Sequence, residues 1–491
     1  MSNKRKAAHN ATSQEANVNV FYNQDCVAGA RAHLGDSSID LIVSDPPYGI
    51  GGDGLDKHYN RDESKVHDGY VEVAADDYEA FSNNWIREAA RVLKPGARIL
   101  VVSGYTHLLG VLDALDAPAN HLIYQHHIIW KYNFGVWTTK KYVSSHYHIL
   151  CYEKRGAIER VRDVDVGDSV WVINREYQTG AVRNKNQLPS QLLKRLLNAG
   201  LPRERRLTLA NRPLVADFFL GSFSTARTAI DEGMDATGFE LNKEAYDYWN
   251  AETMRLLKPD AVKRSKTMID YFKPATPSRE LPATRTISTA SRAASVAGPA
   301  EGAVVTVRTV ATPVHPSANA ASVTVVVCWS QQVPTAAWLD AVVASMGPGG
   351  SFYLVVASLQ LSAALRLLHA QAELTEVNHL IWRSALGGVS SARTHLHILF
   401  WVKPGAIRTF NTYAFFKHTT RMPGPNGNSA NYVDREDVWW KHAENRALTW
   451  PEVLEKILKY SSNARDKVAS FCAGCDALQQ VAASLNRVYC Q

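Results

Sequence analysis

The first residues that could do chemistry are Asp45-Pro46-Pro47-Tyr48, which directly follow the apolar run 40–44. The carboxyl end of a strand is where open α/β sheets bind ligands. The prolines stiffen the turn, so the Asp45 carboxylate and the Pro46 carbonyl can be paired acceptors for an exocyclic amine, while Tyr48 offers a face to a base. Such acceptors raise the electron density of the amine as it attacks a methyl donor. The structural alternative is a proline turn with an exposed tyrosine.

A second motif, the glycine turn within residues 216–225, also follows an apolar run. A glycine turn that leads into a helix lets a ligand approach the backbone, and an acidic residue about 20 positions later can accept hydrogen bonds from ribose hydroxyls. Glu240 has that spacing from Gly221, so the pair indicates a nucleoside-bearing cofactor. The candidate cofactor-binding residues here are Asp217, Phe219, Gly221, Ser222, Glu240 and Asn242.

Aromatic and basic side chains alternate in residues 130–142, a composition suited to stacking bases and neutralising phosphates. An aromatic core with an exposed lysine pair is the alternative. A second basic run, residues 183–206, is equally compatible with a solvated helix face, and the glycine-rich segment 49–68 is expected to be a loop that closes over a flipped base. The candidate nucleic-acid-binding residues are Lys131, Trp137, Lys140, Lys141, Arg183 and Lys185.

Short β-type runs and helical stretches alternate from residue 18 to about 259. This alternation predicts an α/β domain with a mainly parallel sheet, which would bring the ends of its strands to one edge. The expected strands are 40–44, 97–103, 127–130, 147–152, 214–219 and 236–240, and the expected helices are 78–93, 189–198, 225–233 and 243–257.

The composition is that of a globular protein, with 46% hydrophobic and 21% charged residues among 491. The apolar runs are too short for a membrane span, so we expect an intracellular protein, and Lys4-Arg5-Lys6 is compatible with a nuclear location. The net charge of +7 is carried by the chain after residue 260. No metal is expected, because the one CxxC pair, Cys472 and Cys475, lacks a second ligand pair.

The chain also contains an internal repeat. Residues 84–102 resemble 337–355, and 146–150 resemble 395–399, in the same order along the chain. This predicts a disordered basic tail (1–17), a catalytic domain (18–260), a flexible basic linker (261–320) and a degenerate α/β copy (321–491), with convergent α/β patterning as the alternative.

The copy lacks the first domain's chemistry, because Cys328-Trp329-Ser330 stand in place of the DPPY motif. Only 17 residues follow Gly474. We therefore expect no counterpart of the strand that carries Glu240.

Together the motifs resemble the amino methyltransferases that modify adenine N6 or cytosine N4 with S-adenosylmethionine. The DPPY motif precedes the glycine motif, which is similar to the order of the β-type bacterial DNA enzymes. The resemblance implies a Rossmann-like domain over residues 18–255, contact of Asp25 with the cofactor's adenine, and N6 over N4 because position 45 is Asp. The family's usual turn is Asp-Pro-Phe-x-Gly-Ser-Gly, from which Phe218 and Phe223 depart, so we expect weaker cofactor binding.

The expected activity is methyl transfer from S-adenosylmethionine to an adenine N6 in DNA. RNA is an alternative substrate, because a splayed adenine of either nucleic acid can enter such a pocket. A small molecule or a protein amide is a further alternative. So is a non-catalytic nucleic-acid-binding subunit of a methyltransferase complex. The two halves are expected to form an intramolecular pseudo-dimer, with a further protein subunit possible.

Overall fold

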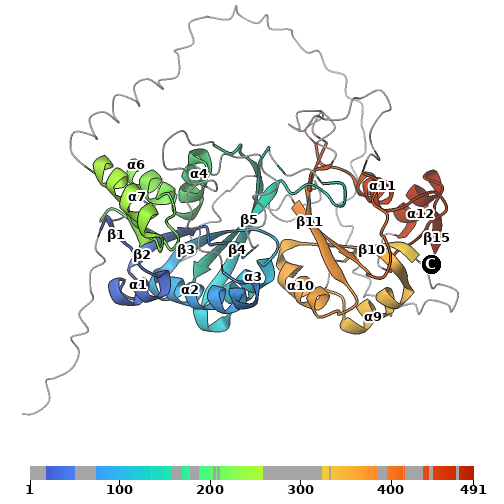
Figure 1. Cartoon of the computed structure of the whole chain (residues 1–491), viewed down its shortest axis with the longest axis horizontal. Helices are drawn as coiled ribbons and strands as arrows, with labels where there is room; N and C mark the ends of the chain where they lie inside the picture. The colour runs from blue at the N-terminus through green and yellow to red at the C-terminus, as the bar shows by residue number, and fades with distance from the viewer. Residues whose placement is uncertain are drawn as a thin grey trace, which may run out of the picture.

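The structure is a computed structural model. It describes residues 18–49, 73–133, 135, 138–156, 168–176, 187–202, 206, 209, 211–257, 323–330, 333–383, 395–412, 414, 435–441, 446–471 and 475–490. They form two β-sheets, each covered by helices on both faces, that meet edge to edge (Figure 1). The predicted tail and linker lie outside these residues. None of the described helices is long and apolar enough to cross a membrane.

The first sheet has the strand order β1-β8-β7-β2-β3-β5-β4-β6. All neighbours pair parallel except those of β5, which confirms the predicted mainly parallel sheet. The strands β1 and β6 were not predicted. The strands are β1 (Val20–Tyr22), β2 (Ile39–Ser44), β3 (Leu93–Ser103), β4 (Leu122–Lys131), β5 (His146–Lys154), β6 (Val170–Val172), β7 (Leu214–Asp217) and β8 (Asp235–Phe239).

Helices cover both faces of this sheet because each carries an apolar stripe. In α2, Trp85, Ile86 and Ala89 are fully buried at helical spacing, and α4 buries four leucines in the same way on the other face. The helices are α1 (Cys26–His33), α2 (Tyr78–Val92), α3 (Leu108–Asp116), α4 (Ser190–Gly200), α6 (Ser224–Asp231) and α7 (Lys243–Leu256), with short 3-10 turns η4 (Ala75–Asp77) and η5 (Pro118–Asn120).

The second sheet has the order β13-β11-β12-β10-β9-β14-β15. Taken from its other end, this is the order of the first sheet without β1. Its strands are β9 (Val323–Trp329), β10 (Met346–Val356), β11 (Thr375–Arg383), β12 (His395–Val402), β13 (Val438–Trp439), β14 (Lys467–Ala469) and β15 (Val488–Cys490), and its helices are α9 (Ala336–Ser345), η6 (Ser358–Gln360), α10 (Leu361–His369), α11 (Trp450–Ser461) and α12 (Cys475–Ser484).

The expectation that the second half has no counterpart of β8 is wrong. β15 pairs parallel with β14, as β8 does with β7, and Tyr489 lies opposite Val468 where Ala236 lies opposite Val215. Strand β15 has only three residues and lies at the edge of the sheet, so it forms its backbone hydrogen bonds with β14 alone. The short stretch after residue 474 is therefore long enough for a helix and a strand.

The two sheets meet through an ion pair on each side of their contact. Lys131 at the end of β4 lies 2.9 Å from the Glu436 carboxylate, and Arg383 at the end of β11 pairs with Asp168. Trp130 lies opposite the β6 tryptophan just as Trp382 lies opposite that of β13, so the two pairs occupy equivalent positions. The contact is therefore isologous, as in a two-fold dimer.

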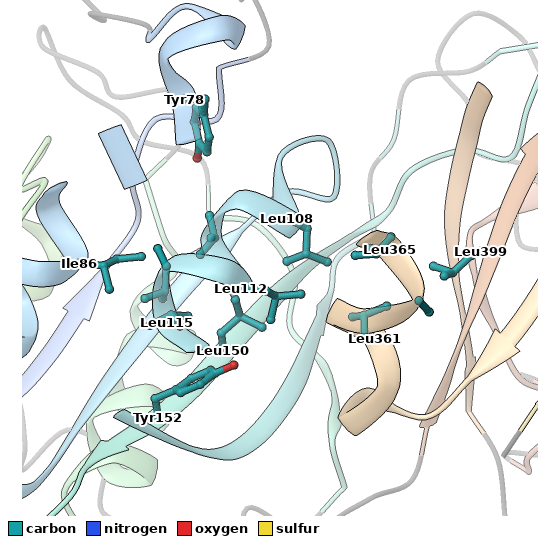
Figure 2. Packing of buried hydrophobic residues seen from close by; sticks show 14 of the residues in the cluster. Tyr78, Ile86, Leu108, Leu112, Leu115, Leu150, Tyr152, Leu361, Leu365 and Leu399 are labelled. Atoms are coloured by element: carbon teal, nitrogen blue, oxygen red, sulfur yellow. The ribbon is translucent and has the colours of Figure 1, made fainter. Parts of the chain in front are cut away.

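Helices α3 and α10 extend this contact below the sheets. Leu108 and Leu112 of α3 face Leu361 and Leu365 of α10, so one buried cluster continues through both halves (Figure 2). Beside the leucines, Arg366 donates to Asp113 at 2.9 Å, and the 253 positions between these two residues equal the offset between the two helices. The pair therefore lies where a two-fold axis would pass.

We expect Lys131→Met to lower the free energy of unfolding of the full chain by about 3–5 kcal/mol, because it leaves the Glu436 carboxylate buried and unpaired. Urea denaturation measures this change. The control is Lys243→Met, which breaks an exposed pair with Asp247 and should cost only about 0–1 kcal/mol. Equal losses in the two variants would contradict a buried, structural role for Lys131.

Candidate active site

The two sequence motifs meet because β2 and β7 are parallel neighbours. Ile42 lies opposite Ala216, so Asp45 and the glycine turn leave the sheet at the same edge. The Phe218 backbone N–H donates to the Ser44 hydroxyl at 3.0 Å, which ties the two strand ends together. The structure therefore brings the predicted catalytic and cofactor residues into one place.

Side chains from the neighbouring helices hold the DPPY turn. The Tyr78 hydroxyl donates to the Pro47 carbonyl at 2.8 Å, and the His107 imidazole is hydrogen-bonded to the Gly49 carbonyl at 3.1 Å. Gly49 has a φ of +63°, and a Cβ there would lie 2.6 Å from the Tyr78 ring, so only glycine fits without a shift. Among the described residues, no donor reaches the Pro46 carbonyl, which remains an acceptor.

Burial raises the pKa of Asp45 to about 7, and the nearby Asp217 carboxylate adds to that rise. Two groups oppose it, since the Tyr48 hydroxyl donates to Asp45 and the Arg175 guanidinium attracts its charge. Burial likewise raises the pKa of Asp217 to about 6. A carboxyl poised near neutrality in this position is typical of groups that handle protons in a reaction.

An arginine and a tyrosine that were not predicted complete this side of the site. Arg175 follows β6 and donates to the Tyr147 hydroxyl at 3.0 Å, while its guanidinium lies 4.4 Å from the centre of the Tyr132 ring. The rings of Tyr48 and Tyr147 are stacked with centroids 5.1 Å apart. The sequence predicted Tyr147 only as a residue of a strand. It gave no position for Arg175, because the strand β6 that precedes it was not predicted.

Glu240 faces the glycine turn from the end of β8. Its Oε2 accepts from the Gly221 N–H at 2.7 Å and its Oε1 from the Asn242 N–H at 2.8 Å. Burial raises the pKa of Glu240, and these two hydrogen bonds counteract that rise. A carboxylate has about four acceptor positions, so this one still has capacity for two hydroxyl donors. The arrangement fits the ribose of a nucleoside cofactor.

Other predicted cofactor residues shape this turn through their hydrogen bonds. Asp217 is buried and accepts from the Phe219 N–H at 3.0 Å, and the Ser222 hydroxyl donates to Gln187 at 2.8 Å. Asn242 caps α7 through the Ala245 N–H. Asp217 therefore fixes the start of the turn, while Ser222 and Asn242 bond to neighbouring elements.

Asp25 is exposed and caps α1, accepting from the N–H groups of Val27 and Ala28. Asn23 donates to the Glu240 carbonyl at 2.8 Å, which holds the Asp25 segment against the end of β8. The segment that carries Asp25 therefore lies beside the end of β8, and the contact of Asp25 with a cofactor stays a prediction.

The two departures from the family's turn lie in the core. Phe223 is fully buried, and its ring contacts Phe21 with centroids 5.1 Å apart. Phe218 packs against Phe239 and Trp85 on the other face of the sheet. Both rings are therefore buried beneath the turn, and Gly221 is half-buried. Weaker cofactor binding stays a prediction.

The predicted nucleic-acid residues have different environments. The prediction that Lys131 binds nucleic acid is wrong. Its ammonium group is buried against Glu436, so a phosphate cannot reach it. Lys140 is exposed, and the Lys141 ammonium donates to the Tyr105 hydroxyl at 2.8 Å. The remaining three lie outside the described residues: Trp137, Arg183 and Lys185.

The second half holds the backbone on which Lys140 and Lys141 lie. Arg435 donates to the carbonyls of Thr138 and Lys141, and the Thr412 hydroxyl donates to the Thr139 carbonyl at 2.8 Å. The second sheet itself has Trp329 at the position of Asp45, because Cys328 lies opposite Leu354 as Ser44 lies opposite Val101.

Comparison with known proteins finds a similar family for part of the first half. Residues 39–251 match the model of the DNA methylase family. A stretch of 125 residues is 30% identical to the type II methyltransferase M.HpaI of Haemophilus parainfluenzae and covers 26% of this chain. It spans 36% of that relative's length.

Solved structures are similar at low identity. TTHA0409, described as a DNA modification methylase of Thermus thermophilus and complexed with S-adenosyl-L-methionine, is 18% identical with a TM-score of 0.34, covering 48% of this chain and 93% of its own. The cytosine-N4-specific PvuII DNA methyltransferase is 13% identical with a TM-score of 0.36, covering 52% and 93%.

The family model spans the strand before Asp45, the glycine turn and the strand end that carries Glu240. These are the elements that the structure brings to one sheet edge. Residues 39–251 therefore match the DNA methylase family model over these elements, and they have an α/β fold.

Proposed function

We propose that the first half, residues 18–260, transfers a methyl group from S-adenosylmethionine to the exocyclic amine of a base in DNA, with adenine N6 as the target. The observation that carries this is the placement of Asp45 beside the glycine turn, with the Pro46 carbonyl as a second acceptor. The match of residues 39–251 to the DNA methylase family model supports this proposal, and the Asp at position 45 of this chain favours adenine N6.

The cofactor would be held between the ends of β7 and β8. Glu240 has acceptor capacity for the ribose hydroxyls, Gly221 lets the ligand approach the backbone, and Asp25 lies at the neighbouring strand end. S-adenosylmethionine supplies an electrophilic methyl group. The chain's own residues position it against the amine and exclude water.

The target amine would join a contact that the structure already contains. The Tyr48 hydroxyl donates to Asp45, and the carboxylate keeps further acceptor positions for the amine. Ionised Asp45 and the Pro46 carbonyl then orient the two N–H groups and concentrate electron density on the nitrogen. The N–C bond forms as the S–C bond breaks, and the nitrogen then loses one proton to Asp45 or to solvent.

The second half, residues 321–491, is proposed to be a degenerate copy that acts as a permanent dimer partner. The matching strand orders and the isologous contact support this interpretation. Its hydrogen bonds to residues 138–141 would position the Lys140 and Lys141 segment for DNA phosphates. A tethered partner acts at high effective concentration, so no second chain is needed.

We expect Asp45→Ala to reduce methyl transfer by about 100-fold or more, because the amine loses its charged acceptor, while cofactor binding measured by calorimetry is retained. Labelled methyl transfer to single-stranded and duplex DNA and RNA, followed by nucleoside analysis, measures the rate and identifies the modified base. Asp36→Ala, which removes an exposed carboxylate, is the control. Near-normal transfer by Asp45→Ala would remove Asp45 from the mechanism, and no transfer to any substrate by the wild type would favour a non-catalytic subunit.

The rate of transfer should rise with pH and level off above about 7, because only ionised Asp45 accepts the amine and its pKa is raised to about 7. Below that pKa the rate falls roughly tenfold per pH unit. Arg175→Gln should move the midpoint to higher pH, since the guanidinium lowers the pKa of Asp45. Rate profiles from pH 5.5 to about 9 test this, with exposed Arg255→Gln as the control. An unchanged midpoint in Arg175→Gln would contradict the assignment.

A further inference from the structure

Six histidines gather where the two sheets meet. Three come from β4 and β5 of the first sheet and three from β11 and β12 of the second, and all six are buried. The two sets occupy equivalent positions in the two sheets. For example, His127 lies three positions before Trp130, and His379 lies three positions before Trp382, the equivalent residue of the second sheet. The six are His127, His146, His148, His379, His395 and His397.

Four of these rings form two matched hydrogen bonds. His127 Nε2 lies 2.9 Å from His148 Nδ1, and His379 Nε2 lies 2.9 Å from His397 Nδ1. Across the contact the rings of His148 and His379 approach to 4.6 Å between centroids, as do those of His127 and His397. Imidazoles of both halves therefore lie against one another without any intervening side chain.

Among the described residues, several nitrogens in this cluster have no hydrogen-bond partner. They include His148 Nε2, His379 Nδ1 and His127 Nδ1, each fully buried. A buried polar atom without a partner costs about 1–3 kcal/mol, so several together in one place indicate that a ligand belongs there. His148 Nε2 and His379 Nδ1 can therefore offer a lone pair to a cation, whereas His397 would exchange one of its two hydrogen bonds for it.

We propose that His148, His379 and His397 bind one divalent transition-metal ion, with Zn²⁺ as the best fit, that joins the two halves of the chain. One nitrogen from each ring lies within 4.8 Å of the others. Tetrahedral zinc with nitrogen ligands needs nitrogen separations of roughly 3.4 Å, which small ring rotations would reach. Three imidazoles without a carboxylate suit zinc over calcium or magnesium.

The surroundings of the three rings are those of a supported metal site. The Ser358 hydroxyl lies 2.9 Å from His397 Nε2, and His127 is hydrogen-bonded to the second nitrogen of His148. Such outer partners orient ligating imidazoles. The expectation of no metal considered only the cysteines, whereas His148 lies far along the chain from His379 and His397.

The position of the ion connects it to the active site. His148 lies on β5 next to Tyr147, whose ring stacks on Tyr48 from the opposite face of the strand. An ion bound to His148 on one strand and to β11 and β12 on the other sheet would hold β5 at a constant distance from the second half. The proposed ion is therefore structural and contacts no substrate.

The test uses the full-length chain without a histidine tag, stripped of metal with a chelator. Calorimetry with Zn²⁺ should give one equivalent bound per chain, Co²⁺ should give the visible absorption of a tetrahedral nitrogen site, and Zn²⁺ should raise the thermal unfolding midpoint. Binding of Zn²⁺ and Co²⁺ to the wild-type chain decides whether the metal site exists. If it binds neither ion, the proposal is overturned.

Substitutions then locate the ion. His148→Gln and His379→Gln should each weaken Zn²⁺ binding by about tenfold or more, while His126→Gln, a buried histidine of β4 outside the cluster, should leave it unchanged. Circular dichroism checks that each variant is folded. Zn²⁺ bound equally well by folded His148→Gln and by the wild type would place the ion elsewhere and overturn the proposal.

Discussion

The parallel pairing of β2 with β7 is the constraint on which the proposed chemistry depends. Parallel neighbours end at the same sheet edge, so the DPPY turn and the glycine turn must open side by side. The Ser44 hydroxyl then joins the two strand ends, and the burial of two neighbouring carboxyls, Asp45 and Asp217, raises the pKa of each. A β-strand register thus sets both the geometry and the electrostatics of the site.

The contact between the sheets has a different role. It buries the Lys131 and Glu436 ion pair, an apolar cluster that continues from α3 into α10, and six histidines. Strand β5 contributes to both the contact and the Asp45 site, with Tyr147 toward the site and His148 toward the contact. The second half can therefore influence the active site through one strand.

The sequence predicts the motifs that meet at this sheet edge, because the spacing of Asp45, Gly221 and Glu240 relative to strands follows from local rules of turns and helix starts. Their catalytic and cofactor-binding roles stay predictions. Lys131 was misassigned, since a lysine among aromatic residues has the same pattern whether it faces a phosphate or a buried glutamate. Arg175 was missed because it follows a three-residue strand, too short to show a period.

The sequence by itself determined the α/β alternation, the two motifs and the colinear repeat, because each depends on residues close together in the chain. Only the tertiary structure decided which groups meet across long separations. Examples are Glu436 with Lys131, Arg175 with Tyr147, and His148 with His379 and His397. Their contacts arise from the packing of one sheet edge against another, and no local pattern in the chain encodes that packing.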